Sequence, residues 1–231
     1  MTEHVNIFAI LGVDPSRLKT EERILYAAMN VFAQHPFGAA SIRMISKEAG
    51  VTLSSVMYHF QSKERLYEAV FGRLMEAHEL TLGPFFERVA KEDALTSEKA
   101  STILREMISA TMDELYSTPE KTVFARIMFL EFYFPSPLYD SLYERFFKKN
   151  YDLLIDLVMA YAEEKDRRRG VLLAVNISGQ IIGFRMERQF LKRYIGLVGY
   201  SPEEAEEMKK IVLDNVFLLL GEERKRNTGS P

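Results

Sequence analysis

Apolar residues recur along most of the chain at the three- and four-residue spacing of amphipathic helices, and no segment alternates convincingly like a strand. The pattern therefore predicts an all-α protein of about nine helices. Three short N-terminal helices are expected near residues 20–35, 42–49 and 53–60, and a long helix should follow from residue 63. The remaining helices are expected at about 97–116, 119–134, 137–165, 170–195 and 202–221.

Short polar segments indicate where these helices begin and end. Thr20 is expected to cap the first helix, and Gly83-Pro84 should kink or break the long helix that starts at Ser62-Lys63-Glu64. Ser201 to Glu204 reads as a capping box with proline at the first helical position, so it should open the last helix. Residues 1–19 are expected to form an N-terminal extension, and residues 222–231 a frayed polar tail.

One stretch, Ser41 to Phe60, predicts two short helices joined by a tight turn. Ser41 can cap the first helix, and Gly50 can end it because glycine tolerates a left-handed backbone. Thr52 or Ser54 can start the second helix, which leaves an outer face of Ser54, Ser55, Tyr58 and His59. Such a unit is either a helix-turn-helix, whose second helix enters the DNA major groove, or an ordinary helical hairpin in a core.

Composition and charge exclude some classes of protein. The 231 residues include 30 Lys and Arg against 33 Asp and Glu, so a net charge of −3 argues against wholesale coating of nucleic acid. A sequence-specific DNA binder needs only a few phosphate contacts, so the acidic balance does not exclude one. There is no cysteine, hence no disulfide and no thiolate metal site. With no signal peptide and no apolar run of membrane-spanning length, we expect a cytoplasmic protein without membrane partners.

The residues that follow the two short helices make the pattern specific. Ala49 to Leu66 reads A-G-V-x-x-x-x-V-x-Y-H-F-x-x-K-x-x-L, and a capped amphipathic helix precedes it. Over about residues 20–70 this resembles the DNA-binding domain of the TetR family of bacterial transcriptional regulators. The resemblance implies a three-helix helix-turn-helix domain at 20–66 and a larger effector-binding and dimerisation domain at 67–221. It also implies a homodimer that binds double-stranded operator DNA.

The resemblance carries over to individual DNA-binding residues. Lys63 should meet a phosphate together with the N–H groups of its helix, the alternative being a solvated lysine. Tyr58 and His59 resemble the aromatic pair that ends the recognition helix, although His59 could instead pack on the first helix. Leu53 is expected either to contact a thymine methyl group or to lie in the core. The full predicted set is Ser41, Arg43, Thr52, Leu53, Ser54, Ser55, Tyr58, His59 and Lys63.

A second informative stretch is Ile127 to Phe134, which is apolar on all sides except for Glu131. A buried carboxylate needs a partner, and Arg126, Arg185 or Arg188 could supply it. Alternatively, Glu131 orients a small-molecule effector in a cavity. The candidate effector residues are Arg126, Glu131, Tyr133, Asn176, Gln180 and Arg185.

The C-terminal part predicts how two copies associate and what the protein senses. Gly179 and Gly183 would let another helix approach closely, so the last two helices could form a dimer interface. Glu131–Pro137 and Gly179–Gln189 are similar to the CecR-like subgroup of the TetR family. That similarity implies a drug- or metabolite-sensing regulator.

Enzyme motifs are poor throughout the chain. There is no P-loop, no G-x-G-x-x-G and no G-x-S-x-G, and His78-Glu79 lacks the second histidine of a zinc helix. We therefore predict no catalytic residues, no metal and no cofactor. The leading hypothesis is a ligand-responsive repressor that binds a palindromic operator as a homodimer. The alternatives are a helical small-molecule-binding protein or enzyme with a vestigial helix-turn-helix, and an activator or nucleoid-type binder.

Overall fold

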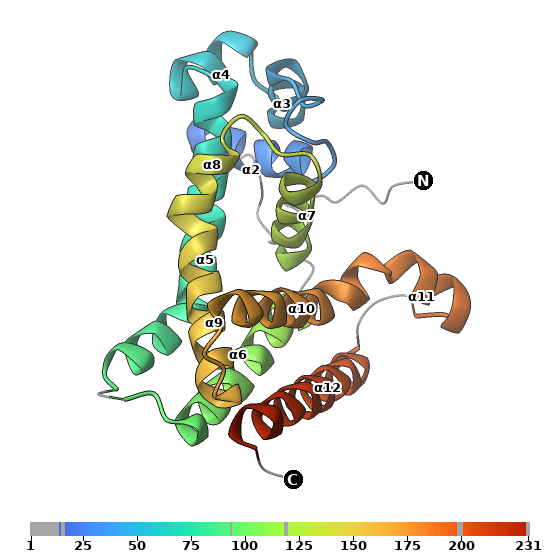
Figure 1. The fold of residues 1–231 in the computed structure, drawn as a ribbon. Helices are drawn as coiled ribbons and strands as arrows, with labels where there is room; N and C mark the ends of the chain where they lie inside the picture. The colour runs from blue at the N-terminus through green and yellow to red at the C-terminus, as the bar shows by residue number, and fades with distance from the viewer. Residues whose placement is uncertain (1–13, 15–16, 93, 118–119, 198–200, 230–231) are drawn as a thin grey trace. The chain divides into compact units, whose positions relative to one another are not determined.

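The computed structural model describes residues 14, 17–92, 94–117, 120–197 and 201–229. Within these residues the protein is all-α, as predicted, with eleven α-helices, one π-helical turn and no strand (Figure 1). Residues 1–13, most of the predicted N-terminal extension, lie outside the described residues. The chain divides into two compact units, residues 1–78 with 118–146 and residues 79–117 with 147–231. The predicted functional division at residue 66 remains a prediction.

The first unit contains the N-terminal helices and a later hairpin of the chain. Its elements are α2 (Thr20–Phe32), α3 (Ile42–Ala49), α4 (Leu53–Phe60), the first half of α5 (Lys63–Ala90), α7 (Glu120–Tyr133), α8 (Tyr139–Leu142) and most of the π turn η2 (Tyr143–Phe147). Helix α2 contacts α3, α4 and α7. The apolar stripe predicted for α2 is buried, as are Ile45 of α3 and Val56 of α4.

An aromatic cluster fills the centre of this unit. The ring of Tyr67 lies 4.6 Å from that of Phe32, 5.0 Å from Phe37 and 5.0 Å from Phe71, measured between centroids. These separations are those of favourable edge-to-face and tilted aromatic pairs. The cluster therefore fixes the start of α5 against α2 and the loop that precedes α3.

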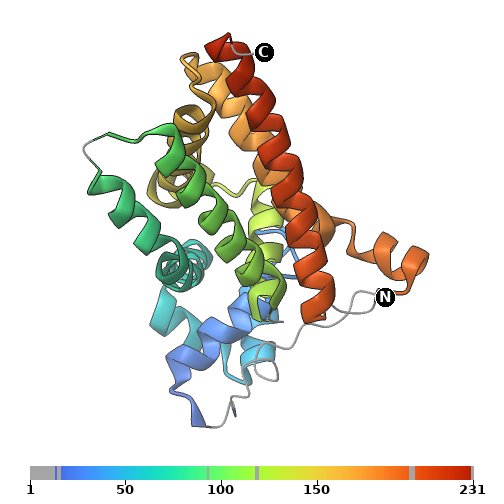
Figure 2. The same ribbon diagram turned by 90° about the horizontal axis from the view of Figure 1, so that it is seen from below.

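The second unit is a bundle of four long helices with a short helix beyond it (Figure 2). Its elements are the second half of α5, α6 (Ser97–Ser117), α9 (Lys148–Ala162), α10 (Arg167–Met186), α11 (Arg188–Ile195) and α12 (Pro202–Thr228). Helices α6, α9, α10 and α12 contact one another. Fully buried Leu104, Leu157, Ile177 and Val216 form part of the core that holds them together.

Two predicted helix boundaries need correction at the N-terminal side. Helix α2 has Lys19, and not Thr20, as its N-cap, and Glu22 accepts a hydrogen bond from the Lys19 backbone N–H at 3.3 Å. Helix α5 continues through Gly83 and Pro84 to Ala90, so Pro84 does not end it. Proline removes one backbone hydrogen bond, but burial of its neighbours Leu82 and Phe85 supplies packing that offsets this loss.

Two helices that were predicted as continuous are interrupted. The helix expected at 137–165 consists of α8, the π turn and α9, and it ends at Ala162. The helix expected at 170–195 starts earlier, at Arg167 with Asp166 as N-cap, and breaks at Glu187 into α10 and α11. A side chain enters the helix ladder shortly before this break. The Tyr116 hydroxyl donates to the Ile181 carbonyl (2.7 Å) and accepts from the Arg185 N–H (3.2 Å), so it stands between two groups that would otherwise pair.

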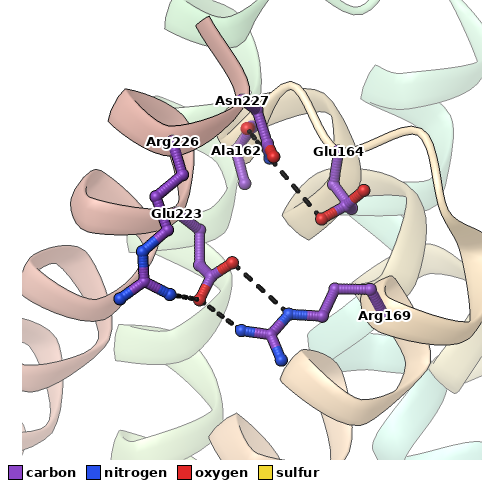
Figure 3. A network of polar contacts seen from close by, with 6 residues as sticks. All are labelled: Ala162, Glu164, Arg169, Glu223, Arg226 and Asn227. Atoms are coloured by element: carbon purple, nitrogen blue, oxygen red, sulfur yellow. Dashed lines mark hydrogen bonds and ion pairs between the residues drawn. The ribbon is translucent and has the colours of Figure 1, made fainter. Parts of the chain in front are cut away.

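The C-terminal segment is helical and anchored, contrary to the predicted frayed tail. Helix α12 continues to Thr228, and Glu223 is buried beneath Arg169 and Arg226 (Figure 3). The Asn227 amide donates to the Ala162 carbonyl at 2.9 Å and lies 3.5 Å from the Glu164 carboxylate. These contacts tie the end of α12 to the end of α9 and the start of α10.

Candidate nucleic-acid interface

Helices α3 and α4 form a helix-turn-helix whose ends are fixed by local hydrogen bonds. Ser41 Oγ accepts from the Met44 N–H and Thr52 Oγ1 accepts from the Ser55 N–H, each at 3.2 Å. Between the helices Gly50 has φ 63° and ψ 36°, the left-handed conformation that glycine adopts without strain. Of the two predicted starts for the second helix, Thr52 is therefore the correct one. Both cap hydroxyls still have a proton that can be donated to a phosphate oxygen.

The outer face of α4 decides against a hairpin buried in a core. Val56 and Phe60 are buried, whereas Leu53 is 47 % exposed and does not belong to the core. Met57 is exposed as well, one helical turn after Leu53, and sequence reasoning missed it although the i, i+4 spacing from Leu53 indicates it. The exposed face consists of Thr52, Leu53, Ser54, Met57 and Tyr58.

The aromatic pair at the end of α4 lies at the border of this face. The Tyr58 ring is exposed and meets the half-buried His59 ring edge-on, with centroids 5.3 Å apart. His59 also lies 6.4 Å from the Phe60 ring. Tyr58 is therefore the member of the pair that can reach outward, whereas the neighbouring rings hold His59.

The cations around the helix-turn-helix differ in how firmly they are held. Arg43 and Lys47 are exposed on α3. Lys63 is bound to the protein: its ammonium donates to the carbonyls of Phe37 (2.9 Å) and Ala40 (3.1 Å) and lies 4.1 Å from the Phe37 ring centroid. An ammonium has three N–H donors, so one remains for a phosphate. Lys63 thus holds the loop before α3, a role that its position in the sequence does not reveal.

The start of α5 is shaped by Gln61 and Ser62. Gln61 has φ 63°, a left-handed value that is uncommon outside glycine, and its side chain accepts from Arg65 at 2.6 Å. Ser62 Oγ accepts from the Arg65 N–H at 3.1 Å, as an N-cap does. The pKa of Glu64 in this first turn lies below its ordinary value because its own backbone N–H and Ser62 donate hydrogen bonds to the carboxylate. The first turn of α5 therefore already stabilises one negative charge, the carboxylate of Glu64.

Glu131 is buried, as predicted, but its partners are not arginines. The carboxylate is 1 % exposed and accepts from the Tyr67 hydroxyl at 2.6 Å, from the Ser136 N–H at 3.0 Å and from Ser136 Oγ at 2.8 Å. The predicted pairing with Arg126, Arg185 or Arg188 is therefore wrong. Burial, and then the Glu131 hydrogen bond and charge, raise the pKa of Tyr67 well above its ordinary value, so its hydroxyl stays a donor. This contact joins α5 to the end of α7.

The other candidate effector residues fall in both units. Arg126 is half-buried and Tyr133 is exposed in the first unit, with its ring 4.6 Å from that of Phe129. In the second unit Gln180 donates to Asn176 at 2.9 Å, and Gln180 Oε1 is buried without a hydrogen-bond partner among the described residues. Arg185 donates from Nε to the Leu115 carbonyl at 3.1 Å. No group of three His, Asp or Glu that could hold a metal occurs in the described part of the chain.

Comparison with known families decides the identity of this helix-turn-helix. A model described as bacterial regulatory proteins of the tetR family matches residues 24–70. A model of the C-terminal domain of the HTH-type transcriptional dual regulator CecR matches residues 100–222, which is more than half of the chain. The chain belongs to the TetR family of transcriptional regulators. It is accordingly a DNA-binding regulator of transcription, as the sequence motif predicted.

Individual relatives of this TetR-family chain are distant. CecR of Shigella flexneri is 21 % identical over 210 residues, which cover 87 % of this chain and 92 % of that protein. RutR of Escherichia coli (strain K12) is 34 % identical over 70 residues, or 30 % of this chain, and the chain spans only 33 % of the length of RutR in that match. What this chain shares with CecR and RutR is therefore limited to features of the TetR family.

Solved structures confirm the TetR-family fold. AibR, in complex with isovaleryl coenzyme A and operator DNA, superposes with a TM-score of 0.61 at 15 % identity and covers 87 % of this chain and 97 % of AibR. HlyIIR, a hemolysin II transcriptional regulator, gives a TM-score of 0.58 at 18 % identity over 86 % of this chain and 98 % of HlyIIR. Among the residues described, no helix combines the length and the apolar character needed to cross a membrane.

Proposed function

We propose that this regulator is a repressor that binds a palindromic operator as a homodimer and releases it when a small molecule binds. The observation that carries the proposal is the exposed outer face of α4, which has no acidic residue and is held rigid by two capped helices. In a helix-turn-helix such a face enters the major groove. The proposed cellular location of the protein is the cytoplasm, where operator DNA is found.

The proposed DNA contacts divide into two classes. Base edges would be read by Leu53, Ser54, Ser55 and Met57, of which Leu53 or Met57 can contact a thymine methyl group. Phosphates would be bound by groups at the edge of the exposed α4 face. These are Arg43, Tyr58, His59, the third N–H donor of Lys63 and the cap hydroxyls of Ser41 and Thr52. At the start of α5 the N–H groups of Glu64 and Arg65 already have acceptors, so Lys63 is the phosphate donor proposed there.

Two helices of the second unit support the proposed homodimer. One side of α10 is exposed and mostly apolar or small, and Cβ atoms added at Gly179 or Gly183 would meet nothing within 4 Å. Ile211 and Leu218 expose a similar stripe on α12. A twofold axis would pair these surfaces with themselves. The proposed dimer surface consists of Leu172, Val175, Gly179, Gly183 and Met186 on α10 with Ile211 and Leu218 on α12.

For the small molecule we keep the predicted residues, with one change. The hydrogen bonds of Glu131 are satisfied by Tyr67 and Ser136, so we infer that Glu131 supports the DNA-binding unit rather than the ligand. The buried Gln180 Oε1 is the strongest remaining acceptor for a ligand donor. AibR has been solved in complex with isovaleryl coenzyme A and operator DNA, so a protein of this fold can bind a small molecule as well as an operator.

The test of operator binding begins with selection of binding sites from random duplex DNA. Arg43→Ala should weaken binding to every selected site and reduce the slope of log affinity against log salt by about one, because a phosphate contact is lost. Lys63→Ala should do the same and also loosen the loop at residues 37–40. Ser55→Ala should alter which bases are preferred.

Arg73→Ala is the matched control, because Arg73 is an exposed arginine of α5 that pairs with Glu76. It should leave both affinity and salt slope unchanged. If the α3 and α4 substitutions behaved like this control, the docking would be wrong. CecR is described as a dual regulator, so activation is the second candidate function. A promoter reporter with and without the protein distinguishes repression from activation.

A further inference from the structure

Helix α11 stands apart from the helices that precede and follow it. None of its eight residues is buried, and Figures 1 and 2 show it projecting beyond the packed helices of the second unit. It starts after the break at Glu187, which follows the Tyr116 hydrogen bonds to the last turns of α10, and ends at Gly196, which has φ 73°. Both ends are thus fixed by specific residues, so the projection is a built feature of the fold.

The projecting helix carries large apolar side chains. Phe190, Tyr194 and Ile195 are 57 %, 78 % and 64 % exposed, and the rings of Phe190 and Tyr194 stack at 5.2 Å with an interplanar angle of 14°. At about 200 Å² per large side chain these fractions amount to about 400 Å² of apolar surface. That is as large as the biggest apolar patch of a typical monomer, and such a patch usually marks an interface.

The position of this patch indicates what covers it. It adjoins the proposed dimer surface of α10 in the chain, because Met186 is the last residue of that stripe and Phe190 lies in the first turn of the helix that follows the break at Glu187. A standard interface needs about 800 Å² from each partner, so 400 Å² on α11 is half of one and not a complete site for an unrelated protein. Added to the α10 and α12 surface, it completes an interface of ordinary size.

Charge points to the same partner. Helix α11 contains Arg188, Lys192 and Arg193 and no acidic residue, whereas the chain as a whole carries a net charge of −3. A second copy therefore offers an acidic body to a basic helix. An element that projects from a twofold surface faces the other copy across the axis, where its apolar side can be buried.

We propose that α11 is an arm that packs on the second copy and extends the dimer interface beyond α10 and α12. The proposal rests on the homodimer proposed above, and it adds residues 188–195 to that interface. Phe190 and Tyr194 anchor the arm, and the break at Glu187 separates it from α10.

Photo-cross-linking from single positions of the full-length protein tests the arm directly. With p-benzoylphenylalanine at Phe190, illumination should give a covalent dimer on a denaturing gel. The same photo-cross-linker at Val175 reports on the α10 surface, and at the exposed Leu80 of α5 it serves as a control that should stay monomeric. A Phe190 product of monomer mass, whether linked to residues 1–13 of its own chain or to nothing, would overturn the arm.

Dimer dissociation measured by sedimentation provides the second test. Phe190→Ser with Tyr194→Ser should raise the dissociation constant at least tenfold, whereas Leu80→Ser should not change it. Equal dissociation constants for both variants would also overturn the arm. The outcomes separate the two proposals. If Val175 cross-links and Phe190 does not, the homodimer stands and only the arm fails; if the wild-type protein is monomeric at every concentration, the homodimer itself fails.

Discussion

Glu131 is a buried carboxylate that is stabilised by hydrogen bonds instead of by a cation. Its two oxygens accept three hydrogen bonds, from Tyr67 and from the N–H and hydroxyl of Ser136. Burying a carboxylate without such partners is strongly unfavourable. Because the Tyr67 ring also packs on Phe37, whose carbonyl accepts from Lys63, one set of contacts leads from the end of α7 to the loop before α3.

Tyr67→Phe should lower the free energy of unfolding by about 1–2 kcal/mol, because it removes one donor and leaves the carboxylate under-satisfied. Urea denaturation followed by circular dichroism measures this change. Tyr58→Phe is the matched control, since Tyr58 is exposed at the end of α4, and it should change stability little. Equal stabilities for the two variants would show that the Tyr67–Glu131 hydrogen bond contributes nothing.

The same tyrosine predicts a dependence on pH. The pKa of Tyr67 is raised in the folded protein, so folding favours the protonated phenol. This contribution is fully present below the ordinary pKa near 10 and is lost as the pH rises above it, because only the unfolded chain then releases the proton. Wild-type stability should therefore fall more steeply above pH 10 than that of Tyr67→Phe. Parallel curves would contradict the raised pKa.

How much of the site is predictable depends on how far apart the interacting residues are. The caps Ser41 and Thr52 act on residues three positions away, and the sequence identifies them. Lys63 binds carbonyls 26 and 23 residues away, and Tyr67 reaches Glu131 across 64 residues. The sequence shows that Glu131 needs a partner but cannot identify it, because tertiary packing decides which donor is near.

Among the elements, the turn between α3 and α4 rests on the conformation of Gly50. Gly50→Ala should destabilise the protein by about 1 kcal/mol, because φ 63° is strained for a residue with a Cβ atom. Gly38→Ala isolates this effect, since both glycines have nothing within 4 Å of an added Cβ and Gly38 lacks the positive φ. Thermal melts of both variants measure it. A loss as large for Gly38→Ala would mean that the left-handed backbone is not the cause.

A helix boundary can be predicted from the sequence where a residue at that boundary determines it. Gly50 and the Ser201–Glu204 capping box both act at their own helix ends. The break at Glu187 carries no glycine or proline, and the hydroxyl that enters the ladder just before it belongs to Tyr116, 65 residues before Ile181. Similarly, the last ten residues are polar enough to suggest a tail, and only long-range partners make most of them helical.

Those long-range partners can be tested at Glu223. Glu223→Gln should lower the melting temperature by about 3 °C or more, because Arg169 and Arg226 lose a shared buried carboxylate at the end of α12. Glu222→Gln is the neighbouring control, since Glu222 is exposed and pairs only with Lys225 among the described residues. Scanning calorimetry of both variants decides the question. Identical melting temperatures would restore the prediction of an unanchored tail.

At the scale of the whole molecule, the outer face of a single α4 helix should discriminate bases only weakly. The outer face of α4 offers serine, threonine and apolar side chains, and it lacks the arginine, asparagine or glutamine that read bases in bidentate fashion. In the proposed homodimer, much of the specificity would therefore come from operator shape and from two faces held at a fixed distance. A linked second face binds at a high effective concentration, which multiplies the affinity of the first.

Val175→Asp should separate these contributions, because it places a charge in the proposed α10 surface far from the DNA-reading residues in sequence. The variant should be monomeric and should bind the selected operator at least 100-fold more weakly, with little change for an isolated half-site. Leu80→Asp, on an exposed position of α5, should match the wild type. Inserting five base pairs between half-sites rotates them by half a helical turn, so it should weaken the wild type strongly and the monomer hardly at all. If both proteins tolerated the insertion equally, the two faces would act independently and fixed spacing would carry no specificity.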